Sequence, residues 1–150
     1  MKQLLILGLF FSLISAFTLN SCDDDDNNGV SQTVIVNNLK DGSWKVTSYV
    51  DSGDNETAHF DGFIFNFEDN GIVTATNGSI IYPGTWSVTD EDNDDDALED
   101  LDLNLTFLLP SDFAELTEDW ELVSQSSTRI EVKHVSGGSG DTDHLTFQKI

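Results

Sequence analysis

The stretch Leu101-Asp102-Leu103-Asn104-Leu105-Thr106-Phe107 gives the clearest structural signal in the chain. Apolar side chains stand at every second position, and polar side chains stand between them. Successive side chains of a β-strand point to opposite faces. This alternation therefore predicts a strand with one face in a core and the other in water.

Alternating apolar patterns on both sides of this strand predict seven more strands. They lie at residues 44–50, 63–67, 72–76, 80–88, 120–123, 130–134 and 145–147, and turn signals such as Asp69-Asn70-Gly71 separate them. In the first strand we expect Trp44, Val46, Ser48 and Val50 on one face and Tyr49 on the other. In the fourth, Pro83-Gly84 indicates a bulge or an edge position.

Eight short strands joined by hairpin-length loops predict an all-β fold, an eight-stranded antiparallel up-and-down barrel, because closure removes exposed sheet edges. Thr33–Lys40 is expected to form a short helix or an irregular turn, and Pro110–Leu116 a single helical turn. Strand order places the 108–118 loop at the barrel end opposite the N-terminal segment, together with the loops at 51–57, 77–80 and 136–142. Phe113 and Leu116 could act there as a lid.

The inward-facing positions of the predicted barrel are rich in aromatic side chains. An eight-stranded barrel has an interior that side chains can just fill, or that can hold one small ligand. A packed core and an apolar pocket share the same alternation, so the sequence leaves both open. The candidate ligand-binding residues are Trp44, Phe63, Phe65, Tyr82, Trp86, Leu103, Phe107, Phe113 and Trp120.

The N-terminal part of the chain predicts export and anchoring. Residues 1–21 carry Lys2 near their start and an apolar run at 4–17, which is typical of a signal peptide and short for a membrane span. A transmembrane anchor and a cleaved signal that leaves a free thiol are the alternatives. Leu19-Asn20-Ser21-Cys22 resembles the lipobox of bacterial lipoproteins. The resemblance implies cleavage before Cys22 and a membrane anchor through lipid on its sulfur.

The acidic run after the cysteine resembles the export signal of surface-exposed lipoproteins in some Gram-negative bacteria. It consists of Asp23, Asp24, Asp25 and Asp26. The resemblance implies an outer-membrane, cell-surface location, and a solvated spacer is the alternative. Residues 22–32 would then be a lipidated acidic tether, and residues 33–150 the barrel domain.

Several short motifs within residues 40–150 resemble lipocalin-like bacterial lipoproteins. They are Gly42-Ser43-Trp44, which matches the G-x-W signature, Gly84-Thr85-Trp86, Leu116 to Trp120, and Leu145 to Lys149. Lys149 stands where lipocalins place an arginine that packs on the tryptophan, and the T-D-Y motif is absent. The resemblance implies a binding module for a small, partly apolar ligand. The alternative is a filled barrel with a structural or interaction role at the cell surface.

The net charge of −22 argues against nucleic acid as a partner and against direct adsorption to anionic lipid. The excess of acidic side chains either keeps the protein soluble or binds divalent cations weakly. Asp92, Asp94 and Asp96 alternate as calcium ligands would, within a run that otherwise reads as a solvated loop. His134 is expected to point inward and His144 outward, so a histidine zinc site is not expected. With no catalytic motif recognised, we expect neither an enzyme nor a cofactor.

Overall fold

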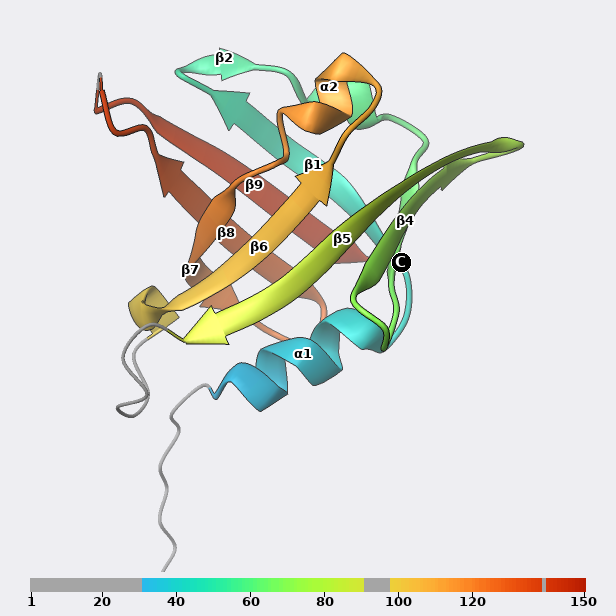
Figure 1. Cartoon of the computed structure of the whole chain (residues 1–150), viewed down its shortest axis with the longest axis horizontal. Helices are drawn as coiled ribbons and strands as arrows, with labels where there is room; N and C mark the ends of the chain where they lie inside the picture. The colour runs from blue at the N-terminus through green and yellow to red at the C-terminus, as the bar shows by residue number, and fades with distance from the viewer. Residues whose placement is uncertain (1–30, 91–97, 139) are drawn as a thin grey trace, which may run out of the picture.

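The computed structural model describes residues 31–90, 98–138 and 140–150. They form a closed, all-antiparallel up-and-down β-barrel of eight strands, which confirms the predicted fold (Figure 1). The strands are β1 (Trp44–Asp51), β3 (Ile64–Phe67), β4 (Ile72–Asn77), β5 (Ile80–Asp90), β6 (Leu101–Phe107), β7 (Asp119–Gln125), β8 (Arg129–Val135) and β9 (Thr142–Lys149). The two-residue β2 (Asp54–Asn55) only extends β1, and pairing of β1 with β9 closes the barrel.

Strand β6 shows how the sequence pattern produces the core. Leu101, Leu103, Leu105 and Phe107 are buried in the interior, while the polar residues between them are half-buried or exposed. β6 pairs with β5 along its whole length. The predicted inward and outward faces are therefore confirmed for this strand.

Strand β1 departs from the simple alternation expected of it. Its register against β9 shifts between Val46 and Ser48. An irregularity of this kind adds one residue to one strand, so it moves the following side chains to the opposite face. Tyr49 is consequently buried, with 2% of its surface exposed, and the expectation that it points outward is wrong.

Strand β5 accommodates Pro83 at an edge. Pro83 pairs with Thr74 of β4 without a register shift, whereas pairing with β6 begins only at Gly84. β5 therefore runs past the end of β6, and one side of Pro83 needs no hydrogen-bond donor. Of the two predicted possibilities, the edge position is the one observed.

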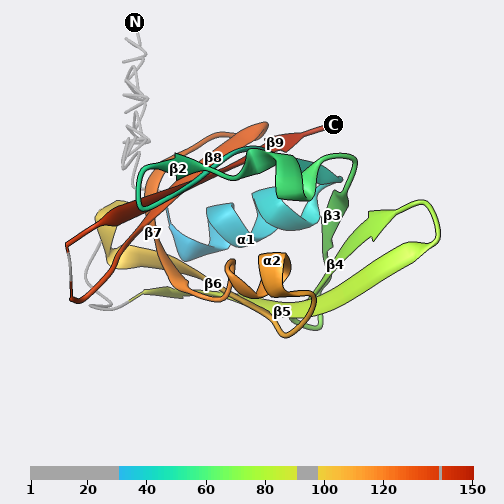
Figure 2. The same ribbon diagram turned by 90° about the horizontal axis from the view of Figure 1, so that it is seen from above.

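Short helices cover the two ends of the barrel, as Figures 1 and 2 show from two directions. At one end lies α1 (Gln32–Lys40), which confirms the helical alternative for this segment; its Ile35 and Leu39 are fully buried. At the other end lie the 3₁₀ helix η1 (Thr57–Phe60) and α2 (Ser111–Ala114). A further 3₁₀ turn, η2 (Leu98–Asp100), precedes β6. Among the described residues, no helix has the length and apolar character needed to cross a membrane.

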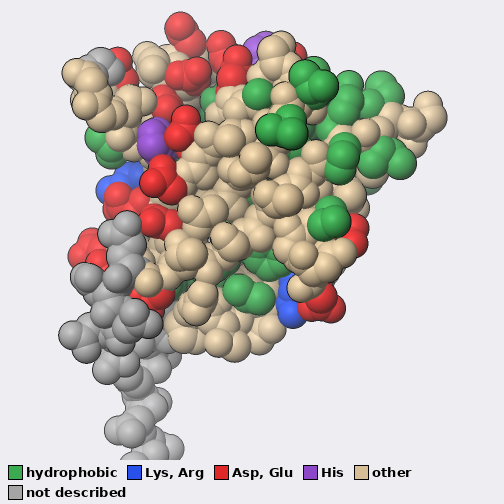
Figure 3. Space-filling model, viewed as in Figure 1, with side chains coloured by type: hydrophobic (Ala, Val, Ile, Leu, Met, Phe, Trp, Pro, Cys, Tyr) green, Lys and Arg blue, Asp and Glu red, His purple; other side chains and the backbone are tan. Residues whose placement is uncertain are grey.

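The surface is unevenly divided between apolar and acidic side chains. Figure 3 shows hydrophobic side chains gathered toward the β4–β5 hairpin and acidic side chains gathered toward the opposite side of the same face. Ile80 and Ile81, at the start of β5, are among the exposed large hydrophobic residues, and Ile81 is 61% exposed. The two sides of the barrel therefore offer different chemistry to a partner.

Candidate functional site

Most of the aromatic residues predicted to line a ligand pocket are instead buried in the barrel interior, whereas Phe63 and Tyr82 are half-buried. Phe113 of α2 enters the far end of the barrel and is 1% exposed. Its ring centroid lies within 4.9–6.0 Å of the rings of five aromatic residues, in mostly edge-to-face arrangements that stabilise aromatic pairs. These five are Phe60, Phe63, Phe65, Tyr82 and Phe107. We call these five rings together with Phe113 the aromatic plug.

The three tryptophans among the candidates have structural partners for their indole N–H groups. Trp44 donates to the carbonyl of Leu39 at 2.9 Å, Trp86 to that of Glu68 at 3.1 Å, and Trp120 to that of Leu116 at 3.0 Å. Leu103 is also fully buried. In this conformation these side chains hold the barrel to its end segments and offer no polar group to a bound molecule.

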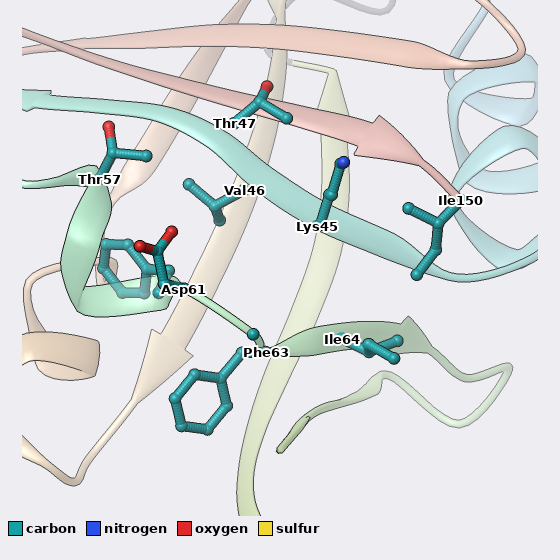
Figure 4. Close-up of a pocket in the computed structure, with 10 residues that line it drawn as sticks. Lys45, Val46, Thr47, Thr57, Asp61, Phe63, Ile64 and Ile150 are labelled. Atoms are coloured by element: carbon teal, nitrogen blue, oxygen red, sulfur yellow. The ribbon is translucent and has the colours of Figure 1, made fainter. Parts of the chain in front are cut away.

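A pocket opens on the outside of the barrel, at the seam between β1 and β3. These two strands pair only at Trp44 and Phe65, so the middle of β1 has no strand neighbour on that side. The chain from η1 to β3 crosses the gap and leaves a cavity of about 570 Å³, the seam pocket (Figure 4). It is lined by Lys45, Val46, Thr47, Thr57, Phe60, Asp61, Gly62, Phe63, Ile64 and Ile150.

The seam pocket combines buried apolar side chains with exposed polar ones. Val46 and Phe60 are buried and Phe63 is half-buried, whereas Lys45 and Asp61 are exposed. Gly62, at φ +80°, turns the chain from η1 into β3. Side chains are strained at this φ, and a Cβ here would also lie 2.8 Å from Nδ2 of Asn77, so the turn that shapes this side of the pocket favours glycine.

Lys45 differs from the other lysines of the described part of the chain. Lys40 pairs with Asp69 at 2.6 Å, Lys133 with Glu121 at 2.8 Å, and Lys149 with Asp41 at 3.0 Å. The one arginine, Arg129, pairs with Glu131. Within residues 31–90, 98–138 and 140–150, the side chain of Lys45 has no ion-pair or hydrogen-bond partner. In a chain with a net charge of −22, this ammonium group is left available to an anion.

Of the candidate ligand-binding residues, the structure brings only Phe63 into this pocket. The sequence reading missed Lys45 and the 57–62 segment because the pattern of β1 gives no sign of the strand missing beside it. Cys22, the acidic run at 23–26, and Asp92, Asp94 and Asp96 lie outside the described residues.

The three histidines lie on three different elements, β8, β9 and η1. His134 is half-buried, with Nδ1 3.2 Å from Oδ1 of Asp119 and Nε2 3.5 Å from Oε2 of Glu118. His144 is exposed on β9. His59 lies on η1, close to Glu56 and Glu115.

Comparisons with known proteins show a likeness in structure, not in sequence family. No protein-family model matches the chain, and no curated protein matches it. Among solved structures, the chain is similar to a DUF4847 family protein from Bacteroides vulgatus. The two share 16% sequence identity over 76% of this chain and 96% of that protein, with a TM-score of 0.49.

Proposed function

We propose that this protein is a lipid-anchored barrel on the outer-membrane surface that binds a small, partly apolar anion in the seam pocket, without catalysis. The observation that carries the proposal is the unpaired Lys45 at the edge of a pocket that combines apolar and polar side chains. The cavity of about 570 Å³ falls within the range of small-molecule sites, which are mostly apolar with a few polar groups that orient the ligand.

The sequence supports the proposed location. Cys22 would carry the lipid after removal of residues 1–21, and the acidic run at 23–26 would direct the protein to the cell surface. The tether would then meet the barrel at the α1 end, so that η1 and α2 face away from the membrane. The lipocalin-like resemblance gains support from Lys149, whose ammonium lies 5.4 Å from the ring centroid of Trp44.

A ligand can enter the seam pocket more easily than the barrel interior. Binding inside the barrel would require Phe113 to leave its five ring neighbours. The seam pocket is already open to solvent beside Lys45. It therefore imposes no such cost on the ligand.

A calorimetric titration tests this function with a set of matched ligands. A carboxylate, an alcohol and an amine that share one medium-length alkyl chain differ only in the group that would meet Lys45. We expect the carboxylate to bind most tightly, and Lys45→Met to remove the preference. Lys133→Met is the control, because Lys133 is paired with Glu121 elsewhere on the barrel. An unchanged preference in Lys45→Met would disprove the role of Lys45.

A specific observation also favours a second function, in which the filled barrel is an interaction domain. Apolar side chains stand exposed at the end away from α1: Ile81 is 61% exposed and Leu108, just before α2, is 81% exposed. Photo-crosslinking from position 81 on intact cells should then yield one discrete protein adduct, and position 87, exposed near the other end of β5, should not. Equal labelling from both positions would count against this function.

A further inference from the structure

The gap beside β1 leaves backbone groups of one residue directed into the seam pocket. In an antiparallel sheet, successive residues of a strand direct their N–H and C=O groups alternately to one neighbouring strand and to the other. The N–H of Ile150 donates to the carbonyl of Ser43 at 2.9 Å, so the backbone groups of Ser43 face β9. β1 and β9 keep one register from Trp44 to Val46. The N–H and C=O of Val46 therefore point away from β9, into the seam.

No segment of the described chain pairs with these two groups. β3 pairs with β1 only at Trp44 and Phe65, so a longer β3 would place Phe63 opposite Val46. The chain turns away at that point, because the N–H of Phe63 donates instead to the carbonyl of Phe60 at 3.1 Å. Within residues 31–90, 98–138 and 140–150, the backbone of Val46 has no hydrogen-bond partner on the seam side. Val46 is 7% exposed, and backbone groups as shielded as these are almost always paired.

The next residue of β1 that faces the seam shows the contrast. The N–H of Tyr49 donates to Oγ1 of Thr57 at 2.9 Å, and its carbonyl accepts from the N–H of Glu56 at 3.0 Å. The segment that leads into η1 thus replaces the missing strand at Tyr49 but not at Val46. The unpaired part of the strand edge lies within the seam pocket, which Val46 lines.

The charged side chains of the pocket give a bound molecule a direction. Figure 4 shows Lys45 and Asp61 on either side of Val46. Neither side chain has an ion-pair partner in the part of the chain that the structure describes. A carboxylate of the ligand is favoured beside Lys45, and an ammonium group beside Asp61. Phe60 and Phe63 add apolar surface for uncharged side chains.

We propose that the ligand of the seam pocket is a short apolar peptide with both ends free, which adds to β1 as an antiparallel strand. The proposal rests on the proposed function of this pocket, and the peptide carboxylate is the anionic group beside Lys45. Lys45 precedes Val46 in β1, so a peptide that ends beside Lys45 runs antiparallel to β1. Its last residue but one then lies opposite Val46 and exchanges both backbone hydrogen bonds with it. Strand addition at a free sheet edge is a recurring mode of peptide recognition.

Calorimetric titration of the purified full-length chain with trileucine and two N-methylated forms tests the pairing. A methyl group on the nitrogen of the middle leucine removes the N–H that would meet the carbonyl of Val46. The same group on the third leucine removes an N–H that would face away from β1. We expect the first form to bind at least about tenfold more weakly than trileucine, because a shielded carbonyl loses its partner, and the second to bind like trileucine. Equal weakening by the two methyl groups, or no binding of trileucine, would overturn the proposal.

N-acetyl-trileucine tests whether the peptide is free at its amino end. We expect it to bind more weakly than trileucine, and Asp61→Asn to weaken only trileucine. Equal affinities for the two in the wild type would overturn a free peptide as the ligand, since the carboxyl end of a longer chain would then fit equally well.

Lys45→Met separates this proposal from the proposed function, with Lys133→Met as the matched control. If alkyl carboxylates bind through Lys45 and the two methylated peptides bind alike, only the strand pairing is overturned. If the methylated peptides differ as expected but Lys45→Met binds trileucine like the wild type, the role of Lys45 is overturned and the pairing at Val46 stands. Circular dichroism should show that all variants are folded.

Discussion

Replacing Phe113 with alanine tests whether the barrel interior depends on the aromatic plug. Phe113 is 1% exposed and meets five aromatic rings, three of them at centroid distances of 4.9–5.1 Å. The substitution removes the whole ring from this buried position. It leaves a cavity bounded by Phe60, Phe63 and Phe107.

The expected cost follows from this burial. Removing a buried phenylalanine side chain typically costs about 3–5 kcal/mol of unfolding free energy. Edge-to-face aromatic pairs add about 0.5–1.5 kcal/mol each beyond their buried area, so we expect Phe113→Ala near the top of this range. For a domain of this size, such a loss lowers the melting temperature by about 10–20 °C.

Urea unfolding followed by tryptophan fluorescence and circular dichroism measures this cost, with the m-value showing that the unfolding reaction is unchanged. Leu108→Ala is the control in the same loop, because Leu108 is 81% exposed and should cost less than about 0.5 kcal/mol. A loss below about 1 kcal/mol for Phe113→Ala, or one equal to that of the control, would show that α2 does not dock into the barrel.

Two further substitutions probe the strands. A Cβ at Gly84 would lie 2.5 Å from the backbone oxygen of Thr106 and 2.8 Å from the ring of Phe107, so Gly84→Ala should cost at least about 1–3 kcal/mol in urea unfolding. Gly137→Ala, with no atom within 4 Å of its added Cβ, should cost less than about 0.5 kcal/mol, and equal costs would contradict this packing. Hydrogen bonds from Ser124, and next from Arg129, lower the pKa of the Glu131 carboxyl. These bonds therefore stabilise the folded protein above the unfolded-state pKa of about 4.3, and this stabilisation is lost as the pH falls below that value. Ser124→Ala should therefore destabilise the protein at pH 7 by at most about 1 kcal/mol, since Glu131 is partly exposed, and much less at pH 3. Ser87→Ala, at an exposed position, is the control. An equal loss of stability at both pH values in Ser124→Ala would contradict this pH dependence.

The sequence predicts the barrel well because each strand carries its own alternation. The alternation within β6 alone predicts which of its faces is buried, whatever strands lie beside it. The face of Tyr49 could not be predicted in this way, because it depends on an irregularity between β1 and β9, which lie almost 100 residues apart in the chain. Local pattern determines a strand, whereas register between distant strands determines which side chains it turns inward.

The candidate site was less predictable for a related reason. The seam pocket exists because β1 and β3 pair at a single position and η1 fills the place of a longer strand. From the sequence, Lys45 resembles any outward-facing lysine of a strand. The structure shows that acids pair with the other lysines of the described residues and not with Lys45. Similarly, Glu115 lies near Glu56 only because α2 docks over η1.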